Sequence, residues 1–224
     1  MLKLEENVIK IKENIEKAAT KSGRKFEDIT LVAVTKTVHF RIIKELTQLG
    51  IKHIGENKVQ NAQSKKQELN LNTDVKWHMI GHLQRNKVKT ALEIFDFFHS
   101  IDSIRLAKEI SKKSTRIIPI LLEVNTSQEP QKFGFKDYEL KENFEQLISL
   151  PNLEIQGLMT MAPFTSDMGK CRQCFIKLRS LLQKLNKEYE MSMKHLSMGM
   201  TQDYEVAVEE GASIVRIGSA FFRD

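Results

Sequence analysis

The chain has 224 residues, which is enough for one domain with a sizeable core, and (β/α) barrels of this length routinely form a single unit. Its 41% hydrophobic and 29% charged residues exclude a disordered chain, and its longest apolar runs, such as IIPILLEV, are too short to cross a bilayer. The net charge of +6 does not indicate nucleic acid, because lysine and glutamate are interspersed and no basic block stands out. We therefore expect one domain over residues 1–224, with no membrane or nucleic-acid partner.

The N-terminal segment predicts an amphipathic helix. Apolar residues recur at helical spacing at Leu4, Val8, Ile11, Ile15 and Ala18, among many lysines and glutamates. A signal peptide would need an uninterrupted apolar core, so we expect a cytoplasmic protein.

Short β-like runs then alternate with longer helical patterns along the chain, which indicates parallel βα units. Eight such runs occur: Leu31–Thr35, Lys52–Gly55, Lys76–Ile80, Phe97–Ile101, Ile117–Val124, Ile155–Met161, His195–Met198 and Ile214–Ile217. Eight strands favour a closed (β/α)8 barrel. An open doubly wound sheet is the alternative, but it usually has fewer strands and often a glycine-rich phosphate turn, which is not present here.

The barrel prediction locates the functional site. Barrels of this kind carry their active sites at the carboxyl ends of the strands and bind phosphate after strands 7 and 8. Polar segments follow the predicted strand ends here: Lys36, GENK (55–58), GHLQRNK (81–87), NTS (125–127), SMGMT (197–201) and RIGS (216–219). We therefore expect a binding site at this end of the barrel.

Lys36 directly follows the first apolar run. It shares strand parity with Val32 and Val34, so a barrel whose interior receives those valines also receives the lysine. In a partly desolvated pocket its amine would lose a proton more readily and could attack an aldehyde to form a Schiff base. A snorkelling lysine at a strand end is the alternative reading of this residue alone. Lys58 and Lys132 are further amines near the strand ends.

The segments after the seventh and eighth runs are suited to phosphate. Both SMG and IGS pair a glycine, which permits close backbone approach, with a serine hydroxyl and neighbouring N–H donors. The first segment leads into a helix, for which we expect Thr201 as the N-cap and Gly211 as the stop, so that the helix end adds positive potential. Two ordinary βα turns are the alternative.

Arg216 lies in the apolar stretch SIVRIGSAFF. Its guanidinium cannot lose a proton, so it needs an acceptor nearby. An internal carboxylate would serve, and so would a ligand atom with a lone pair, such as a pyridine nitrogen.

The cysteines and the remaining histidines give weaker signals. Cys171 and Cys174 share a helical face with three leucines, which favours core packing over a redox pair or a zinc site. His78 and His82 stand four apart, but on a strand and loop without the H-E-x-x-H glutamate, so we expect no metal.

A barrel, a Schiff-base lysine, a phosphate cradle and an arginine for a ring nitrogen together describe a pyridoxal 5′-phosphate (PLP) site. The sequence resembles the YggS/PROSC family of pyridoxal phosphate homeostasis proteins, from about residue 31 to the C-terminus. The matching segments, in the family's order, are AVTK, IGENKVQ, WHMIGHLQRNK, HSIDS, LLEVNTSQEPQKFGF, GLMTMAP and LSMGMTQDYEVAVEEGASIVRIGSAFF. The resemblance implies an α/β fold, a (β/α)8 TIM barrel like the N-terminal domain of alanine racemase (PLP fold type III), with PLP held covalently as an aldimine on Lys36.

Carried over residue by residue, the resemblance also implies the rest of the site. The phosphate would be held by Ser197, Met198, Gly218 and Ser219, the pyridine nitrogen would face Arg216, and Asn57 would lie beside the cofactor. Two positions depart from residues common in the family, Ser219 and Thr201, but both keep a hydroxyl. The tail after the last motif is shorter than in the family.

The resemblance implies a role in vitamin B6 and amino-acid balance, through reversible PLP binding with PLP-dependent apoenzymes as recipients. Alanine racemase-type enzymes pair the same lysine with a tyrosine of a second β-domain, whereas this sequence ends seven residues after Ile217. An arginine at the ring nitrogen also weakens the electron sink that carbanion chemistry needs. We therefore expect a non-catalytic, monomeric carrier. A weak one-base amino-acid racemase is the alternative, and a phosphosugar-binding barrel enzyme is a third possibility.

Overall fold

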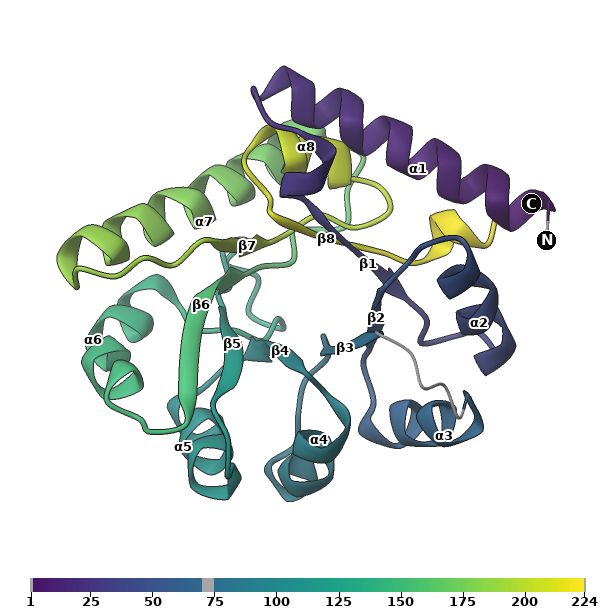
Figure 1. Ribbon diagram of the computed structural model, residues 1–224. Coiled ribbons are helices and arrows are strands. Elements are labelled where there is room, and N and C mark those ends of the chain that lie inside the picture. The colour runs from purple at the N-terminus through teal and green to yellow at the C-terminus, as the bar shows by residue number, and fades with distance from the viewer. Residues whose placement is uncertain (1, 70–74, 224) are drawn as a thin grey trace.

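The computed structural model describes residues 2–69 and 75–223, in which parallel strands close into a barrel in sequence order, β1-β2-β3-β4-β5-β6-β7-β8 (Figure 1). The strands are β1 Thr30–Val34, β2 His53–Glu56, β3 Lys76–Met79, β4 Phe97–Ile101, β5 Ile118–Glu123, β6 Leu153–Met159, β7 His195–Ser197 and β8 Ile214–Ile217. Strand β1 pairs with both β2 and β8, which closes the ring. The predicted (β/α)8 barrel is confirmed, and the strand ends lie within two residues of the predicted runs.

The helices surround the barrel, as Figure 1 shows. They are α1 Leu2–Lys21, α2 Phe40–Gln48, α3 Val59–Leu69, α4 Val88–Ile94, α5 Ile104–Lys113, α6 Asp137–Ile148, α7 Met168–Glu188 and α8 Tyr204–Glu209, with short 3-10 turns at Phe26–Asp28, Arg85–Lys87 and Ser219–Phe221. None of the helices in residues 2–69 and 75–223 combines the length and the apolar character that a membrane span requires.

Helix α1 has the face that its sequence predicts. The five apolar residues at helical spacing, from Leu4 to Ala18, are all buried. The helix also holds the other end of the chain, because the Asn7 side chain donates to the carbonyls of Phe221 (3.0 Å) and Arg223 (2.9 Å). Both termini therefore lie at the same side of the barrel (Figure 1).

The core has two layers. The larger lies between the strands and the helices, and a smaller apolar cluster fills part of the barrel interior, formed by Val32, Leu121, Met159 and Ile214. Strand alternation explains this division, since successive side chains of a strand point to opposite faces of the sheet. Strands β6 and β7 approach so closely that a Cβ added at Gly157 would lie 1.9 Å from the His195 carbonyl oxygen, so this position requires glycine.

Candidate functional site

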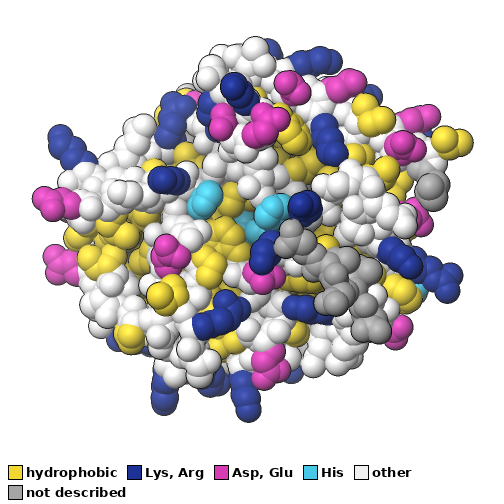
Figure 2. All heavy atoms as spheres, in the orientation of Figure 1, with side chains coloured by type: hydrophobic (Ala, Val, Ile, Leu, Met, Phe, Trp, Pro, Cys, Tyr) yellow, Lys and Arg dark blue, Asp and Glu magenta, His cyan; other side chains and the backbone are white. Residues whose placement is uncertain are grey.

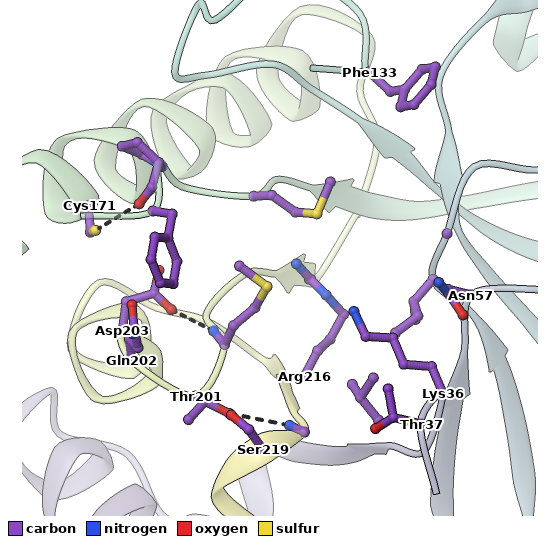
Figure 3. A pocket seen from close by; sticks show the side chains of 18 of the residues that line it. Lys36, Thr37, Asn57, Phe133, Cys171, Thr201, Gln202, Asp203, Arg216 and Ser219 are labelled. Atoms are coloured by element: carbon purple, nitrogen blue, oxygen red, sulfur yellow. Dashed lines mark hydrogen bonds between the residues drawn. The ribbon is translucent and has the colours of Figure 1, made fainter. Parts of the chain in front are cut away.

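A cavity of about 560 Å³ lies at the carboxyl ends of the strands, where the sequence predicts the binding site. Five of the seven predicted site residues line it: Lys36, Asn57, Arg216, Gly218 and Ser219. Figure 3 shows Lys36, Asn57 and Arg216 pointing into the same space, with Thr201 and Ser219 on the side of β8. Segments distant in sequence thus meet where the strands end.

Lys36 lies just beyond β1. The Thr35 N–H still donates to the Gly55 carbonyl (3.0 Å), so the strand geometry continues almost to the lysine. Val32 points into the barrel interior, as the parity argument requires. The Lys36 side chain is exposed to solvent, which differs from the partly desolvated pocket expected from the sequence. The reason is that this lysine follows the strand end and lies at the mouth of the barrel.

No other lysine of the described residues lines this cavity. Lys58 is exposed, and the Lys132 amine pairs with Glu129 and donates to the carbonyls of Met161 (3.3 Å) and Ala162 (3.1 Å). Of the three amines that the sequence suggested, Lys36 is therefore the one placed to react with a molecule in the cavity.

A buried ion pair lies directly behind Lys36 and Asn57. The Lys65 amine of α3 donates to Glu56 Oε1 (2.7 Å) and to the Thr35 carbonyl (2.6 Å), and the Thr35 hydroxyl donates to the same carboxylate oxygen (2.6 Å). The Glu56 side chain is fully buried and that of Lys65 is 13% exposed. This network joins α3 to Thr35 and Glu56 at the ends of β1 and β2. Thr35 directly precedes Lys36 in the sequence, and Glu56 directly precedes Asn57.

Arg216 is buried among neutral acceptors. Its Nη1 donates to Ser197 Oγ (2.6 Å) and its Nη2 donates to the Thr160 carbonyl (2.9 Å). In the described part of the chain no carboxylate lies within ion-pair distance of this guanidinium. Burial lowers the pKa of Arg216 to about 10, while the charges of Glu123 and Asp203 act in the opposite direction. The guanidinium therefore stays charged and faces the cavity without a counterion in contact.

The two turns after β7 and β8 are joined by Thr201. Its hydroxyl accepts from the N–H groups of Gly218 (3.4 Å) and Ala220 (3.3 Å), which are long hydrogen bonds that an anion could replace. The first turn needs Gly199, whose φ is +92° and where an added Cβ would lie 2.6 Å from Ala207 Cβ. Backbone and hydroxyl donors thus gather at one wall of the cavity.

The expected N-cap role of Thr201 is wrong. Helix α8 begins only at Tyr204, with Asp203 at the N-cap, and the Asp203 carboxylate accepts from the Met200 N–H (2.6 Å). Gln202 and Asp203 separate Thr201 from this helix of six residues, and the N-cap position is taken by an acidic residue. Gly211 does follow the helix, with φ +98°, as predicted for the stop.

Two predicted site residues lie outside the lining of the cavity. Both are fully buried: Ser197 points into the barrel interior beneath Arg216, and Met198 packs between the strands and the helices. Side-chain alternation separates them, because Ser197 is the last residue of β7 and Met198 follows it directly. In the turn after β7, the hydroxyl that lines the cavity is that of Thr201, two residues beyond Gly199.

Acidic residues in the cavity escaped the sequence analysis. Glu123, at the end of β5, is 3% exposed, and burial together with the nearby Asp102 raises its pKa to about 7, while Arg216 opposes the shift. Burial also raises the pKa of Asp203. The available signal was a glutamate one residue before the end of the apolar run IIPILLEV, which parallels the lysine after the first strand.

The remaining lining residues form the outer wall. The His82 ring stacks on Phe133 with 4.2 Å between ring centroids, and its Nδ1 bonds to Asp102 (2.6 Å). The Cys171 thiol contacts the Pro163 carbonyl (3.7 Å), and burial raises its pKa, as expected for a packed cysteine. Cys171 and Cys174 are both buried on the predicted face of α7. In residues 2–69 and 75–223 no group of three or more His, Cys, Asp or Glu could hold a metal.

Comparison with known proteins gives one consistent result. The family model described as alanine racemase, N-terminal domain, matches residues 7–224. A pyridoxal phosphate homeostasis protein of Aquifex aeolicus (strain VF5) is 41% identical over 220 residues, which cover 97% of this chain and 96% of the relative. The protein of that name from Escherichia coli (strain K12) is 35% identical over 222 residues, covering 96% and 94%.

Solved structures agree with the sequences. PipY, the COG0325 family member of Synechococcus elongatus PCC7942, with PLP bound, superposes with a TM-score of 0.83 at 34% identity, covering 88% of this chain and 93% of that chain. Alanine racemase from Corynebacterium glutamicum has a TM-score of 0.72 at 14% identity, covering 98% of this chain and 60% of that chain. The second likeness shows the fold alone.

Proposed function

We propose, on the premise that this chain belongs to the pyridoxal phosphate homeostasis proteins and shares the alanine racemase N-terminal fold, that it binds PLP reversibly in this cavity. The observation that carries the proposal is that one cavity receives both the only lining lysine of the described residues and a buried arginine without a contacting counterion. PLP offers an aldehyde to the first and a ring nitrogen with a lone pair to the second.

The cavity residues have separate roles in this proposal. Lys36 holds PLP as a Schiff base, Arg216 donates to the pyridine nitrogen, and Asn57 lies beside the ring. Gly218 and Ser219 bind the phosphate, together with the hydroxyl of Thr201. The donors fit this anion, because two backbone N–H groups already converge on one oxygen there.

The same arrangement favours a carrier. PLP supplies a reactive aldehyde and an electron-withdrawing ring, and the ring withdraws electrons best when its nitrogen is protonated. Arg216 can only donate a hydrogen bond, so it leaves that nitrogen unprotonated. We propose that the protein buffers PLP within vitamin B6 and amino-acid balance and releases it to PLP-dependent apoenzymes, without catalysis of its own.

A weak amino-acid racemase is the second candidate, and Glu123 is the observation that favours it. A carboxyl group with a pKa of about 7 in the same cavity could exchange protons near neutral pH. Incubation of the PLP-loaded protein with single enantiomers of several amino acids separates the two candidates. Racemisation that disappears in both Lys36→Ala and Glu123→Gln would replace the carrier proposal.

The first test of the carrier proposal is the visible absorbance of the purified protein titrated with PLP, before and after borohydride reduction. We expect a yellow band that reduction removes, and a covalent label on Lys36 in the peptide map. Lys36→Ala should give neither, whereas Lys58→Ala, which changes an exposed lysine near the same strand ends, should behave as wild type. A colourless wild type, or a label at another lysine, would contradict the proposal.

A further inference from the structure

A continuous hydrogen-bonded chain crosses the barrel interior behind the cavity. His53 Nδ1 bonds to His78 Nε2 (2.9 Å), His78 Nδ1 to His99 Nε2 (2.8 Å), and His99 Nδ1 to Ser197 Oγ (2.9 Å). Ser197 Oγ then meets Nη1 of Arg216 at 2.6 Å. The chain takes one residue each from β2, β3, β4, β7 and β8.

Arg216 sets the direction of every link. A guanidinium only donates, so Ser197 Oγ accepts from it. Among the described residues the other hydrogen-bond partner of this fully buried oxygen is His99 Nδ1, so the hydroxyl proton is satisfied by donation to that nitrogen. His99 then carries its proton on Nε2 and donates to His78, and His78 likewise donates from Nε2 to His53. The chain is complete only with neutral imidazoles that all have the Nε2–H tautomer.

The surroundings keep the imidazoles neutral. His78 is 2% exposed and His99 is fully buried. Desolvation lowers the pKa of both imidazoles. Neighbouring positive groups lower it further: His53 lowers the pKa of His78, and His78, Arg216 and His195 lower that of His99. At the Arg216 end of the chain two carboxyl groups act in the opposite direction, because Glu123 and Asp203 raise the pKa of Arg216.

His53 is the outer end of the chain. It is half-buried at the start of β2, and desolvation with Lys76 and Lys52 lowers its pKa, against Asp96. Figure 2 shows histidine side chains near the middle of this face of the molecule, beside lysine or arginine side chains. Because His53 is half-buried and Arg216 is 3% exposed, the chain has its more accessible end at His53 and a buried end at the cavity.

We propose that Ser197 and the imidazoles of His99, His78 and His53 position the Arg216 guanidinium for its acceptor in the cavity. With Nη1 held by Ser197 and Nη2 by the Thr160 carbonyl, the guanidinium plane is held in one orientation while Arg216 lines the cavity. Ser197 then serves Arg216 and not the phosphate. The identity of the acceptor as a pyridine nitrogen rests on the proposed function.

The test of the chain itself uses the protein without PLP. Nitrogen NMR of histidine-labelled protein distinguishes the two neutral tautomers of each imidazole. We expect His78 and His99 to be Nε2-protonated in the wild type, and His99 to show both tautomers in Ser197→Ala. His195→Leu is the matched control, because His195 is a half-buried histidine at the start of β7 outside the chain; it should leave the tautomers of His78 and His99 unchanged.

Ser197→Cys protects the test against a failure of Ser197→Ala to fold. Cysteine keeps the side-chain shape but makes only weak hydrogen bonds, so it should shift His99 in the same direction. A His99 protonated on Nδ1 in the wild type, or a His99 tautomer unchanged in a folded Ser197 variant, would overturn the inference.

PLP titration gives the second readout. Loss of a hydrogen bond to a charged group should weaken PLP binding about tenfold in Ser197→Ala, with unchanged binding in His195→Leu. Unchanged PLP affinity in Ser197→Ala would also overturn the positioning role. If the wild type did not bind PLP while the tautomers were as expected, the proposed function would fail and the directed chain would stand.

Discussion

At the scale of single residues, the site is defined by charges held away from direct counterions. Among the described residues Arg216 donates to neutral acceptors only, and Glu123 lies in the same cavity with a pKa raised to about 7 by burial. The guanidinium favours an anionic or lone-pair ligand, whereas an ionised Glu123 disfavours an anion. The charge of the cavity therefore changes near neutral pH.

The first prediction follows from Glu123. Below pH 7 its carboxyl group is neutral, and above pH 7 it is negative, so anion binding weakens as pH rises through about 7. We expect the PLP affinity of the wild type to fall by up to about tenfold relative to Glu123→Gln between pH 6 and pH 8, since one pKa unit corresponds to about 1.4 kcal/mol. Affinities measured by absorbance at both pH values check this. A constant ratio between the two proteins would contradict it.

At the scale of elements, α3 fixes the ends of β1 and β2. The Lys65 amine connects the helix to the Thr35 carbonyl and to the buried Glu56 carboxylate, whose Oε2 is buried without a hydrogen-bond partner in the described residues. Lys36 directly follows Thr35 in the sequence, and Asn57 directly follows Glu56. The position of both cavity residues thus depends on an ion pair outside the cavity.

The second prediction concerns this pair. Lys65→Met leaves an unpaired buried carboxylate and should lower the free energy of unfolding by about 3–5 kcal/mol. The double variant Lys65→Met with Glu56→Gln should recover much of the loss, because no charge then remains buried. Urea unfolding measures the free energy of unfolding of the wild type, of Lys65→Met and of the double variant.

The control is a pair of the same type on the surface. Lys113 and Glu109 lie 2.7 Å apart on α5 with partly exposed side chains. Lys113→Met should change the free energy of unfolding by less than about 1 kcal/mol. Equal losses in Lys65→Met and Lys113→Met would show that the α3 pair has no special weight.

At the scale of the whole molecule, the barrel interior is partly polar. The apolar cluster around Val32 and Met159 shares the interior with the histidine chain, which spans the barrel from the start of β2 to β8. Since these imidazoles fold in the neutral form, proton binding by the unfolded chain opposes folding in acid.

The third prediction is the pH dependence of stability. The pKa of His78 falls from 6.5 to about 3 on folding, and that of His99 is also well below 6.5. The unfolded chain binds more protons between these values, so stability is lost as pH falls from about 6.5 toward 3. Each of the two histidines should contribute about 1.4 kcal/mol per pH unit in that range. The free energy of unfolding in urea, measured between pH 6.5 and pH 4.5, should fall more steeply with decreasing pH in the wild type than in His78→Leu, by about that slope. Equal slopes in the two proteins would contradict the assignment.

Most of the fold was predictable from sequence because its signals are local. Alternating short apolar runs and amphipathic helices follow from side-chain periodicity, and the buried face of α1 follows from helical spacing. Lys36 was found by the same periodicity, since its parity with Val32 can be read along one strand. The motifs after β7 and β8 located the cavity end of the barrel.

Sequence by itself therefore determined the barrel, the end at which its cavity lies, and the lysine and arginine that face it. Only the tertiary structure decided which hydroxyl of the SMGMT segment lines the cavity, because the bend at Gly199 places Thr201 there and leaves Ser197 inside the barrel. It also brought His99 to Ser197, which are 98 residues apart. The physical reason is that hydrogen bonds across a barrel join side chains from different strands, whose contacts leave no periodic signal along the chain.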